Sequence, residues 1–293
     1  MKHFLSLKDY SEKEILEVFS LAEKIKSEPE NYADSLKSKN MAMIFQGKST
    51  RTRTSFEAGI SKLGGHAVNL DYQGTHLDKA RLKDEIRAIQ GYFDFILARI
   101  VSQKELEEIS MVCTKSILIN GLTDKFHPCQ ALADFLTIQE HFGKLKGLTL
   151  TFVGDAGNVC NSLIIAGSKL GLKVKVACPE NYFPLNEAVE MSNSFIPVEI
   201  IHSAEKAIVD SDIVYTDSWI SLLGHQSSET GKRLEDAKNF CVNEKLMRLA
   251  EKTQFSCTAC LLTLVLKSLK KFLSQKIPWF SSRLKTECGC KTL

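Results

Sequence analysis

Apolar residues recur along the chain with two periods, and the two periods alternate. Short continuous apolar runs bounded by turn residues are typical of buried strands, and apolar positions three and four residues apart are typical of amphipathic helices. In the first half of the chain this pattern predicts strands at residues 41–45, 66–70, 93–100 and 116–120, with helices at residues 15–25, 49–63, 82–92 and 130–142. Such alternation favours a parallel sheet with helices on both faces.

A short break at residues 143–147, with a glycine at each end, separates this half from a second alternation. There the pattern predicts strands at residues 148–153, 173–178, 198–201 and 213–216, with helices at residues 158–170 and 204–209. We therefore predict an α/β protein of two domains, each a mostly parallel sheet flanked by helices. The boundaries that we expect are residues 1–145 and 146–255, followed by an atypical tail at residues 256–293.

The composition argues against several classes of protein but does not indicate a function. The chain has 293 residues, of which 44% are hydrophobic and 25% charged, and this is ordinary for a globular protein. The formal net charge of +3 comes from scattered lysines and arginines, so nucleic acid is not an expected partner. The apolar runs are too short to span a membrane, and residues 1–10 lack the apolar core of a signal peptide. We expect a cytoplasmic protein.

Five of the nine cysteines lie singly along the first 255 residues, and we expect reduced, mostly buried thiols at Cys113, Cys129, Cys160, Cys178 and Cys241.

The densest polar cluster follows the first predicted strand. Residues 47–54 read Gly-Lys-Ser-Thr-Arg-Thr-Arg-Thr and lead into a predicted helix. A helix N-terminus offers free N–H groups and the positive end of the helix dipole, which suits a phosphate. Hydroxyls at Ser49, Thr50 and Thr52 add donors, and Arg51 adds a two-pronged cation. A Ser/Thr-rich helix cap with surface arginines is the alternative, but two Thr-Arg steps at this turn favour an anion site.

Two better-known phosphate motifs match only in part. A P-loop needs a glycine five residues before Gly47, where this chain has Ala42. Residues 154–157 read Gly-Asp-Ala-Gly between a strand and a helix, like part of a dinucleotide loop, but the full glycine pattern is missing. A nicotinamide-dependent oxidoreductase stays open as an alternative from another class, although it would not explain residues 49–53.

Residues 49–53, Ser-Thr-Arg-Thr-Arg, resemble the carbamoyl-phosphate signature of the aspartate and ornithine carbamoyltransferases. Further matches follow in family order: Arg99 at a strand end, His-Pro-Cys-Gln at residues 127–130, Gly154-Asp155 with Asn158, and Asp-Ser-Trp-Ile-Ser at residues 217–221. The resemblance covers residues 2–255. It implies a first domain that binds carbamoyl phosphate, a second that binds an amino acid, and a homotrimer or a multiple of trimers. It implies no cofactor and no metal.

The resemblance also implies a role for each matching residue. The reaction places negative charge on the carbonyl oxygen and on the departing phosphate, so fixed donors are needed at both. Arg99 would bridge the phosphate and the carbonyl oxygen, His127 would donate to that oxygen, and Gln130 would accept from the carbamoyl NH2 group. These three would be the catalytic residues. The phosphate itself would be held by Ser49, Thr50, Arg51 and Thr52, with His76 reaching the phosphate site of a neighbouring subunit.

The acceptor implied by the resemblance is L-ornithine, with L-citrulline and phosphate as products and arginine biosynthesis as the setting. Asp217 suits the α-ammonium group and Asn158 the carboxylate, with Ser221 and Leu222 completing the site. Aspartate has a second carboxylate, and the aspartate branch of the family meets it with an arginine soon after the strand that ends here at Thr216. A modified ornithine, another diamine or aspartate itself stay open as alternative acceptors.

Residues 256–293 depart from the family pattern. Cys257 and Cys260 with Cys288 and Cys290 are irregularly spaced for a zinc site. Back-translation offers another reading, because a shifted frame can encode MHCLPAY, FEVSEEI and AENR, which are family motifs in the family order. The hypothesis is that the tail is a frame-shifted reading of a normal gene. We would then expect the second sheet to lack its last strand, and an inactive scaffold that binds only carbamoyl phosphate is a third alternative.

Overall fold

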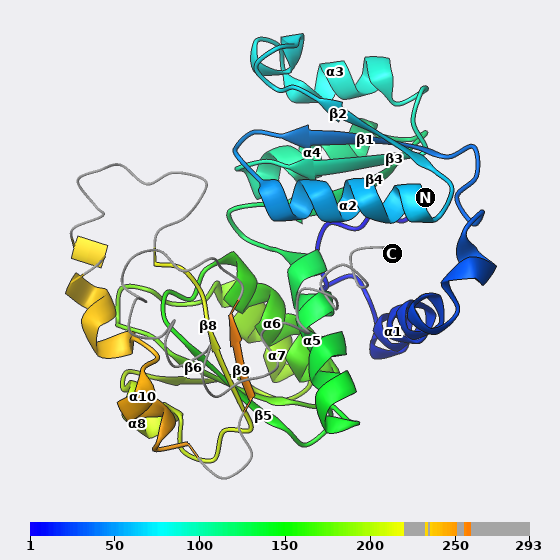
Figure 1. Cartoon of the computed structure of the whole chain (residues 1–293). Coiled ribbons are helices and arrows are strands. Elements are labelled where there is room, and N and C mark those ends of the chain that lie inside the picture. The colour runs from blue at the N-terminus through cyan, green and yellow to red at the C-terminus, as the bar shows by residue number, and fades with distance from the viewer. Residues whose placement is uncertain (220–231, 234, 251–254, 259–293) are drawn as a thin grey trace. The chain divides into compact units, whose positions relative to one another are not determined.

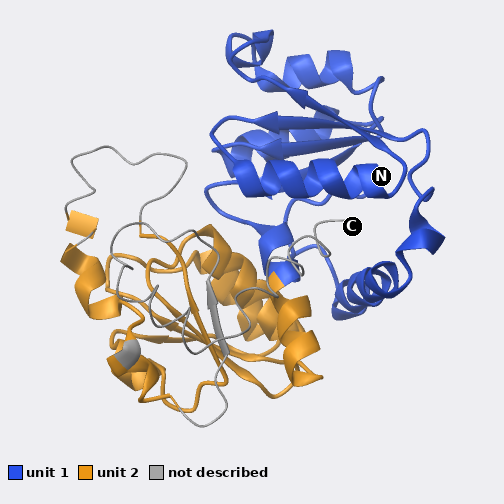
Figure 2. Ribbon diagram, in the orientation of Figure 1, with its two compact units in different colours: residues 1–133, 285–293 blue, residues 134–284 orange. Residues whose placement is uncertain are grey.

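The computed structural model describes residues 1–219, 232–233, 235–250 and 255–258. They fall into two compact units that divide between Ala133 and Asp134, within helix α5 (Pro128–Phe142) (Figure 2). Each unit is a parallel sheet flanked by helices, so the predicted fold class is confirmed. Among the described residues, no helix has both the length and the apolar character needed to cross a membrane.

The first unit contains a four-stranded sheet of order β2-β1-β3-β4, and every neighbouring pair is parallel. Its strands are β1 (Asn40–Phe45), β2 (His66–Leu70), β3 (Phe95–Arg99) and β4 (Ile117–Leu122). Its helical segments are α1 (Glu12–Ser27), η1 (Pro29–Tyr32), α2 (Thr50–Lys62), η2 (His76–Asp78), α3 (Leu82–Ile89) and α4 (Gln103–Val112).

The pleat of β1 and β3 divides the core of this unit between two faces. Met43 and Leu97 point to the face that is covered by α2, where they meet Phe56 and Ile60. The intervening strand residues point to the opposite face and join side chains of α3 and α4. Figure 1 shows α2 lying along its face of the sheet. Each of these side chains contributes roughly 1.5–3 kcal/mol when fully buried, so the core fixes where α2 begins.

The second unit contains a five-stranded parallel sheet of order β7-β6-β5-β8-β9. Its strands are β5 (Thr149–Val153), β6 (Lys173–Ala177), β7 (Glu199–Ile201), β8 (Ile213–Thr216) and β9 (Phe255–Thr258). Helix α6 (Asn158–Lys169) packs beside α7 (Asn186–Asn193). A hydrophobic core cluster of this unit joins residues of β5, β6 and β8 to residues of three helical segments. These segments are α8 (Ala204–Ala207), η3 (Ala237–Phe240) and α10 (Glu244–Met247) (Figure 1).

The expectation that the second sheet lacks its last strand is wrong. Residues 255–258 form β9, which pairs in parallel with β8 from Ile213↔Phe255 to Thr216↔Thr258. Parallel pairing is made by backbone N–H and C=O groups, so it does not require the family's own side chains. Residues 259–293, which include three of the four clustered cysteines and most of the proposed frame-shifted segment, lie outside the described residues.

Candidate active site

The strand order of the first sheet places a topological switch point between β1 and β3. The chain leaves β1 toward β2 on one side and leaves β3 toward β4 on the other, and open sheets bind ligands at the carboxyl ends of such neighbours. Phe45 and Arg99 are the last paired residues of the two strands. The residues predicted to bind phosphate therefore begin four residues beyond one strand end, and Arg99 is the other strand end.

The structure brings Arg99 together with the start of α2. Arg99 is only 5% exposed, and its Nη1 atom donates to the Thr52 hydroxyl at 3.2 Å. Thr52 is itself 3% exposed and lies in the first turn of α2, for which Ser49 is the N-cap residue in an extended conformation. A buried guanidinium held beside the positive end of a 13-residue helix is an arrangement suited to an anion.

Gln46, which no sequence motif marked, stabilises this edge of the sheet. The backbone N–H of Gln46 donates to the Arg99 carbonyl at 3.0 Å, and the Gln46 side-chain oxygen accepts from the Val101 N–H at 2.7 Å. The Gln46 side-chain amide also donates to the Tyr72 hydroxyl at 3.1 Å. Gln46 thus ties together the ends of β1, β2 and β3. The position of Gln46 directly after a predicted strand was the only feature of the sequence that could have indicated this role.

His127 and Gln130 follow the end of β4, the strand next to β3. A tight turn precedes them, in which the Thr123 N–H donates to the Phe126 carbonyl at 2.9 Å and the Thr123 hydroxyl accepts from the Phe126 N–H at 3.2 Å. The His127 carbonyl then accepts from the Gln130 N–H at 3.2 Å, at the start of α5. Both side chains are buried, so their conformations are restricted before any substrate binds.

His76 has a different environment. It lies in η2, where its side chain is exposed while the adjacent Leu77 is buried. The Thr75 hydroxyl accepts from the Leu77 N–H at 3.4 Å and caps this short helix. Exposure is what the predicted role in a neighbouring subunit requires, and that role stays a prediction.

The second unit has a corresponding switch between β5 and β8, where two of the predicted acceptor residues lie. Asn158 begins α6 after the loop that leaves β5, and Asp217 follows β8 directly. Gly154 adopts a φ of +140°, a conformation that side-chain-bearing residues rarely adopt. The Thr216 hydroxyl donates to the Val153 carbonyl at 2.8 Å and ties the two strand ends together. Ser221 and Leu222 lie outside the described residues.

Two of the cysteines expected to be buried thiols lie in the core of this unit. Cys160 and Cys178 are free and buried, and burial raises the pKa of both thiols, that of Cys178 to about 11. Across the described ranges, no group of three His, Cys, Asp or Glu residues could hold a metal ion.

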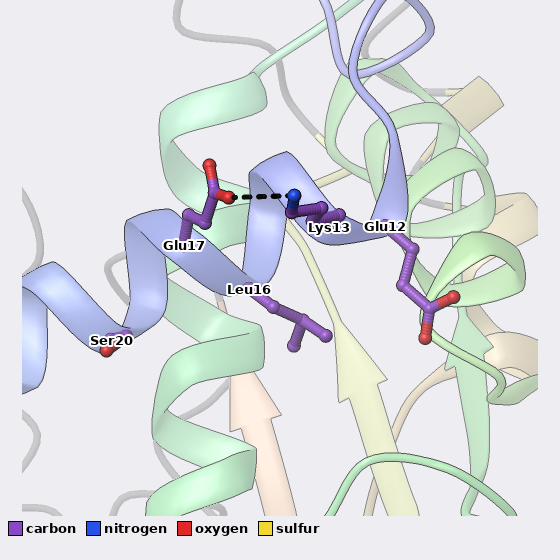
Figure 3. A pocket seen from close by; sticks show the side chains of 5 residues that line it. All are labelled: Glu12, Lys13, Leu16, Glu17 and Ser20. Carbon is purple, nitrogen blue, oxygen red and sulfur yellow. Dashed lines mark ion pairs between the residues drawn. The ribbon is translucent and has the colours of Figure 1, made fainter.

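A surface hollow of about 380 Å³ lies along α1, and Figure 3 shows its lining residues. All five lining residues come from the exposed side of that helix: Glu12, Lys13, Leu16, Glu17 and Ser20. Lys13 and Glu17 form an ion pair there at 3.9 Å. None of them belongs to the predicted site, and one face of a single helix offers no converging groups for catalysis.

Comparisons with known proteins match the chain to two domain models of one family. The aspartate/ornithine carbamoyltransferase carbamoyl-P binding domain matches residues 2–140, and the Asp/Orn binding domain of the same family matches residues 146–258. The ornithine carbamoyltransferase of Archaeoglobus fulgidus is 37% identical over 86% of this chain and 82% of its own length. That of Campylobacter hominis is 40% identical over 85% of this chain and 82% of its own length.

Solved structures of the same family superpose on this chain. An ornithine carbamoyltransferase from Pyrococcus furiosus superposes with a TM-score of 0.88 at 33% identity, covering 99% of this chain and 95% of that one. The anabolic ornithine carbamoyltransferase of Campylobacter jejuni superposes with a TM-score of 0.90 at 30% identity, covering 100% of this chain and 97% of that one.

Proposed function

We propose, from the premise that this chain belongs to the aspartate/ornithine carbamoyltransferase family, that it transfers the carbamoyl group of carbamoyl phosphate to the δ-amine of L-ornithine. The products would be L-citrulline and phosphate, as in arginine biosynthesis. Family membership makes the chain a carbamoyltransferase that uses carbamoyl phosphate. The contact between buried Arg99 and Thr52 at the start of α2 is the observation that carries the site assignment.

The donor half of the reaction follows from the charges that develop in it. Attack on the carbamoyl carbon places negative charge on the carbonyl oxygen, and its collapse places charge on the departing phosphate. The start of α2 and Arg51 would hold the phosphate. Arg99, already oriented by Thr52, would reach both the phosphate and the carbonyl oxygen, with His127 as a second donor to that oxygen. Holding both reactants in place can lower the activation barrier by ~7–11 kcal/mol.

The acceptor half favours ornithine over aspartate because arginines, which would bind a second carboxylate, are scarce in the second unit. Residues 134–258 contain two arginines, Arg233 and Arg248. Arg233 is paired with Asp155 at 2.5 Å, and Arg248 is exposed near the end of α10. Asp217, at the switch between β5 and β8, supplies a negative charge instead. A site with a carboxylate at its centre suits the ammonium group of ornithine better than the second carboxylate of aspartate.

The oxidoreductase alternative is weakened by the loop that suggested it. A dinucleotide would place its pyrophosphate at the N-terminus of α6, beside Asp155. Asp155 is paired with Arg233, so together the two side chains offer that group no net positive charge.

We also propose a homotrimer or a multiple of trimers, in which the exposed His76 would complete the phosphate site of a neighbouring subunit.

Replacing Arg51 by alanine is expected to weaken carbamoyl phosphate binding by about 1.5–3 kcal/mol, because a charge-assisted contact to the phosphate is lost. Isothermal titration calorimetry with carbamoyl phosphate or a phosphonate mimic measures this change. Arg53→Ala is the matched control, because Arg53 is half-exposed and pairs with Glu57 at 3.7 Å on the outside of α2. Equal affinity of the Arg51 variant and the parent chain would show that Arg51 does not bind the phosphate.

Replacing Asp217 by asparagine is expected to raise the Kd of L-ornithine more than about tenfold, since the countercharge to its ammonium group is removed. The Kd of carbamoyl phosphate should stay within about twofold of the parental value. Titration of each ligand separately measures the two effects. Asp210→Asn is the matched control, because Asp210 is exposed and its φ of +59° is one that asparagine tolerates. A parallel loss of both ligands would instead indicate a folding defect.

A further inference from the structure

Five side chains meet at the carboxyl edge of the second sheet, and the roles assigned above leave them out. They come from four separate segments: the loop after β5, the loop after β6, the residues after β8, and the segment that leads into η3. The five are Asp155, Tyr182, Trp219, Arg233 and Asp236.

Tyr182 is the centre of this cluster. The Arg233 guanidinium lies over its ring, with Cζ 5.2 Å from the ring centroid, and the Trp219 ring meets it edge-on at 5.3 Å and 76°. The Tyr182 hydroxyl donates to an Asp236 carboxylate oxygen at 2.8 Å. Burial and the hydrogen bond to Asp236 raise the pKa of Tyr182 to about 12, so the phenol keeps the proton that it donates at neutral pH.

Arg233 links the cluster to the loop that precedes α6. Its Nη1 atom lies 2.5 Å from Asp155, and the two side chains are only 20% and 24% exposed, so water screens the pair less than it screens a surface ion pair. Asp155 sits within a turn in which its carbonyl accepts from the Gly157 N–H at 2.8 Å. The Ala156 N–H donates to the Tyr182 carbonyl at 3.3 Å and joins this turn to the loop after β6.

The cluster therefore connects the two loops that carry the proposed acceptor residues. Asp155 lies three residues before Asn158, which would bind the acceptor carboxylate. Trp219 lies two residues after Asp217, which would bind the acceptor ammonium. A ligand held at both ends is sensitive to the spacing of these loops, since a displacement of about 1 Å in a substrate-positioning group can cost on the order of 10²-fold.

We propose that Arg233 and Tyr182 are positioning residues of the acceptor site. Arg233 fixes the turn before Asn158 through Asp155, and Tyr182 fixes the segment after Asp217 through Trp219. Neither residue needs to touch the acceptor for this role. The inference rests on the proposed function, because it takes Asn158 and Asp217 as the acceptor-binding pair.

The test is calorimetry of the full chain, with L-ornithine titrated after the first domain has been saturated with a carbamoyl phosphate mimic. Arg233→Gln and Tyr182→Leu are expected to raise the Kd of L-ornithine about tenfold, because each removes a cation–π contact together with a second interaction of the cluster. The Kd of the carbamoyl phosphate mimic should stay within about twofold, because its binding residues lie in the first unit. The control is Lys238→Gln, which breaks the exposed Lys238–Glu235 pair of the same segment, whose side chains are 66% and 70% exposed.

Two further variants separate positioning from general stability. Tyr182→Phe keeps the ring that contacts Arg233 and Trp219, so it should retain most of the ornithine affinity that Tyr182→Leu loses. The double variant Asp155→Asn with Arg233→Gln should bind L-ornithine no more weakly than Arg233→Gln alone, because both substitutions break the same ion pair.

Parental ornithine affinity in Arg233→Gln would overturn the inference, and so would an equal loss of both ligands. If the parent chain with its first site filled binds no ornithine, the proposed function fails and the inference fails with it. If the parent binds ornithine and the variants bind it equally well, the proposed function stands and the inference alone fails.

Discussion

Replacing residues 256–293 by their shifted-frame reading is expected to raise the rate of citrulline formation by more than about 10³-fold. The family match ends at residue 258, and the motifs that the resemblance leads us to expect beyond it are absent from the sequence. The resemblance implies that a cysteine and an arginine from those motifs would contact the ornithine side chain and the carbonyl oxygen. Loss of one oxyanion donor typically costs ~10²–10³ in turnover, and here two contacts are missing together.

The comparison requires two matched proteins, both assayed for citrulline at saturating substrate. One carries the MHCLPAY-to-AENR reading from residue 256, and the other carries a scrambled tail of the same composition as the present one. The scrambled tail should leave the rate of the parent chain unchanged. Comparable activity in the parent and the restored protein would contradict this prediction. A gene whose bases cannot encode the three motifs in the shifted frame would remove the reading-frame hypothesis itself.

Replacing Arg99 by glutamine is expected to lower kcat by about 10³-fold or more. Arg99 is the strand-end cation that would face both the phosphate and the carbonyl oxygen, and it acts from a buried position where charge is weakly screened. Arg99→Lys should fail almost as badly, because lysine lacks the planar fork that can donate to Thr52 and to substrate at once. Steady-state kinetics in the frame-restored background measures both variants.

Arg53→Gln supplies the control for this experiment, since it removes a half-exposed arginine of the same motif. Thermal unfolding of all variants shows whether a change in kcat follows from lost stability. An Arg99→Gln protein that is folded and retains parental kcat would mean that Arg99 only supports the sheet edge.

The fold was predictable where a short apolar run was unbroken or where a helix presented a wide apolar face. The predicted strands at residues 41–45 and 213–216 are confirmed almost residue for residue, and the helix predicted from residue 49 begins at Thr50. Helix α4 was missed because its buried apolar residues, Leu106 and Ile109, make too narrow a stripe to establish a period. The strand orders could not be predicted, because nothing in a strand's own sequence says which neighbours it pairs with.

The candidate site was predictable in its residue types but not in its internal contacts. Placing polar residues at the carboxyl ends of strands was enough to bring Thr52 and Arg99 into one site. The partners that orient them were not visible, because Gln46 and Arg233 are single polar residues without a repeating pattern. Arg233 reaches Asp155 across 78 residues of sequence, and only the folded sheet brings such positions together.

Transfer of the carbamoyl group to ornithine can be followed directly with an isotope label. Carbon-labelled carbamoyl phosphate is incubated with a high concentration of the chain and either L-ornithine or L-aspartate, and the labelled product is identified by NMR. We expect the label to move to L-citrulline with ornithine, slowly in the present chain and rapidly once the tail is restored, and we expect aspartate to accept none. Label in carbamoyl-aspartate, or no transfer to ornithine even in the restored protein, would contradict the proposed function.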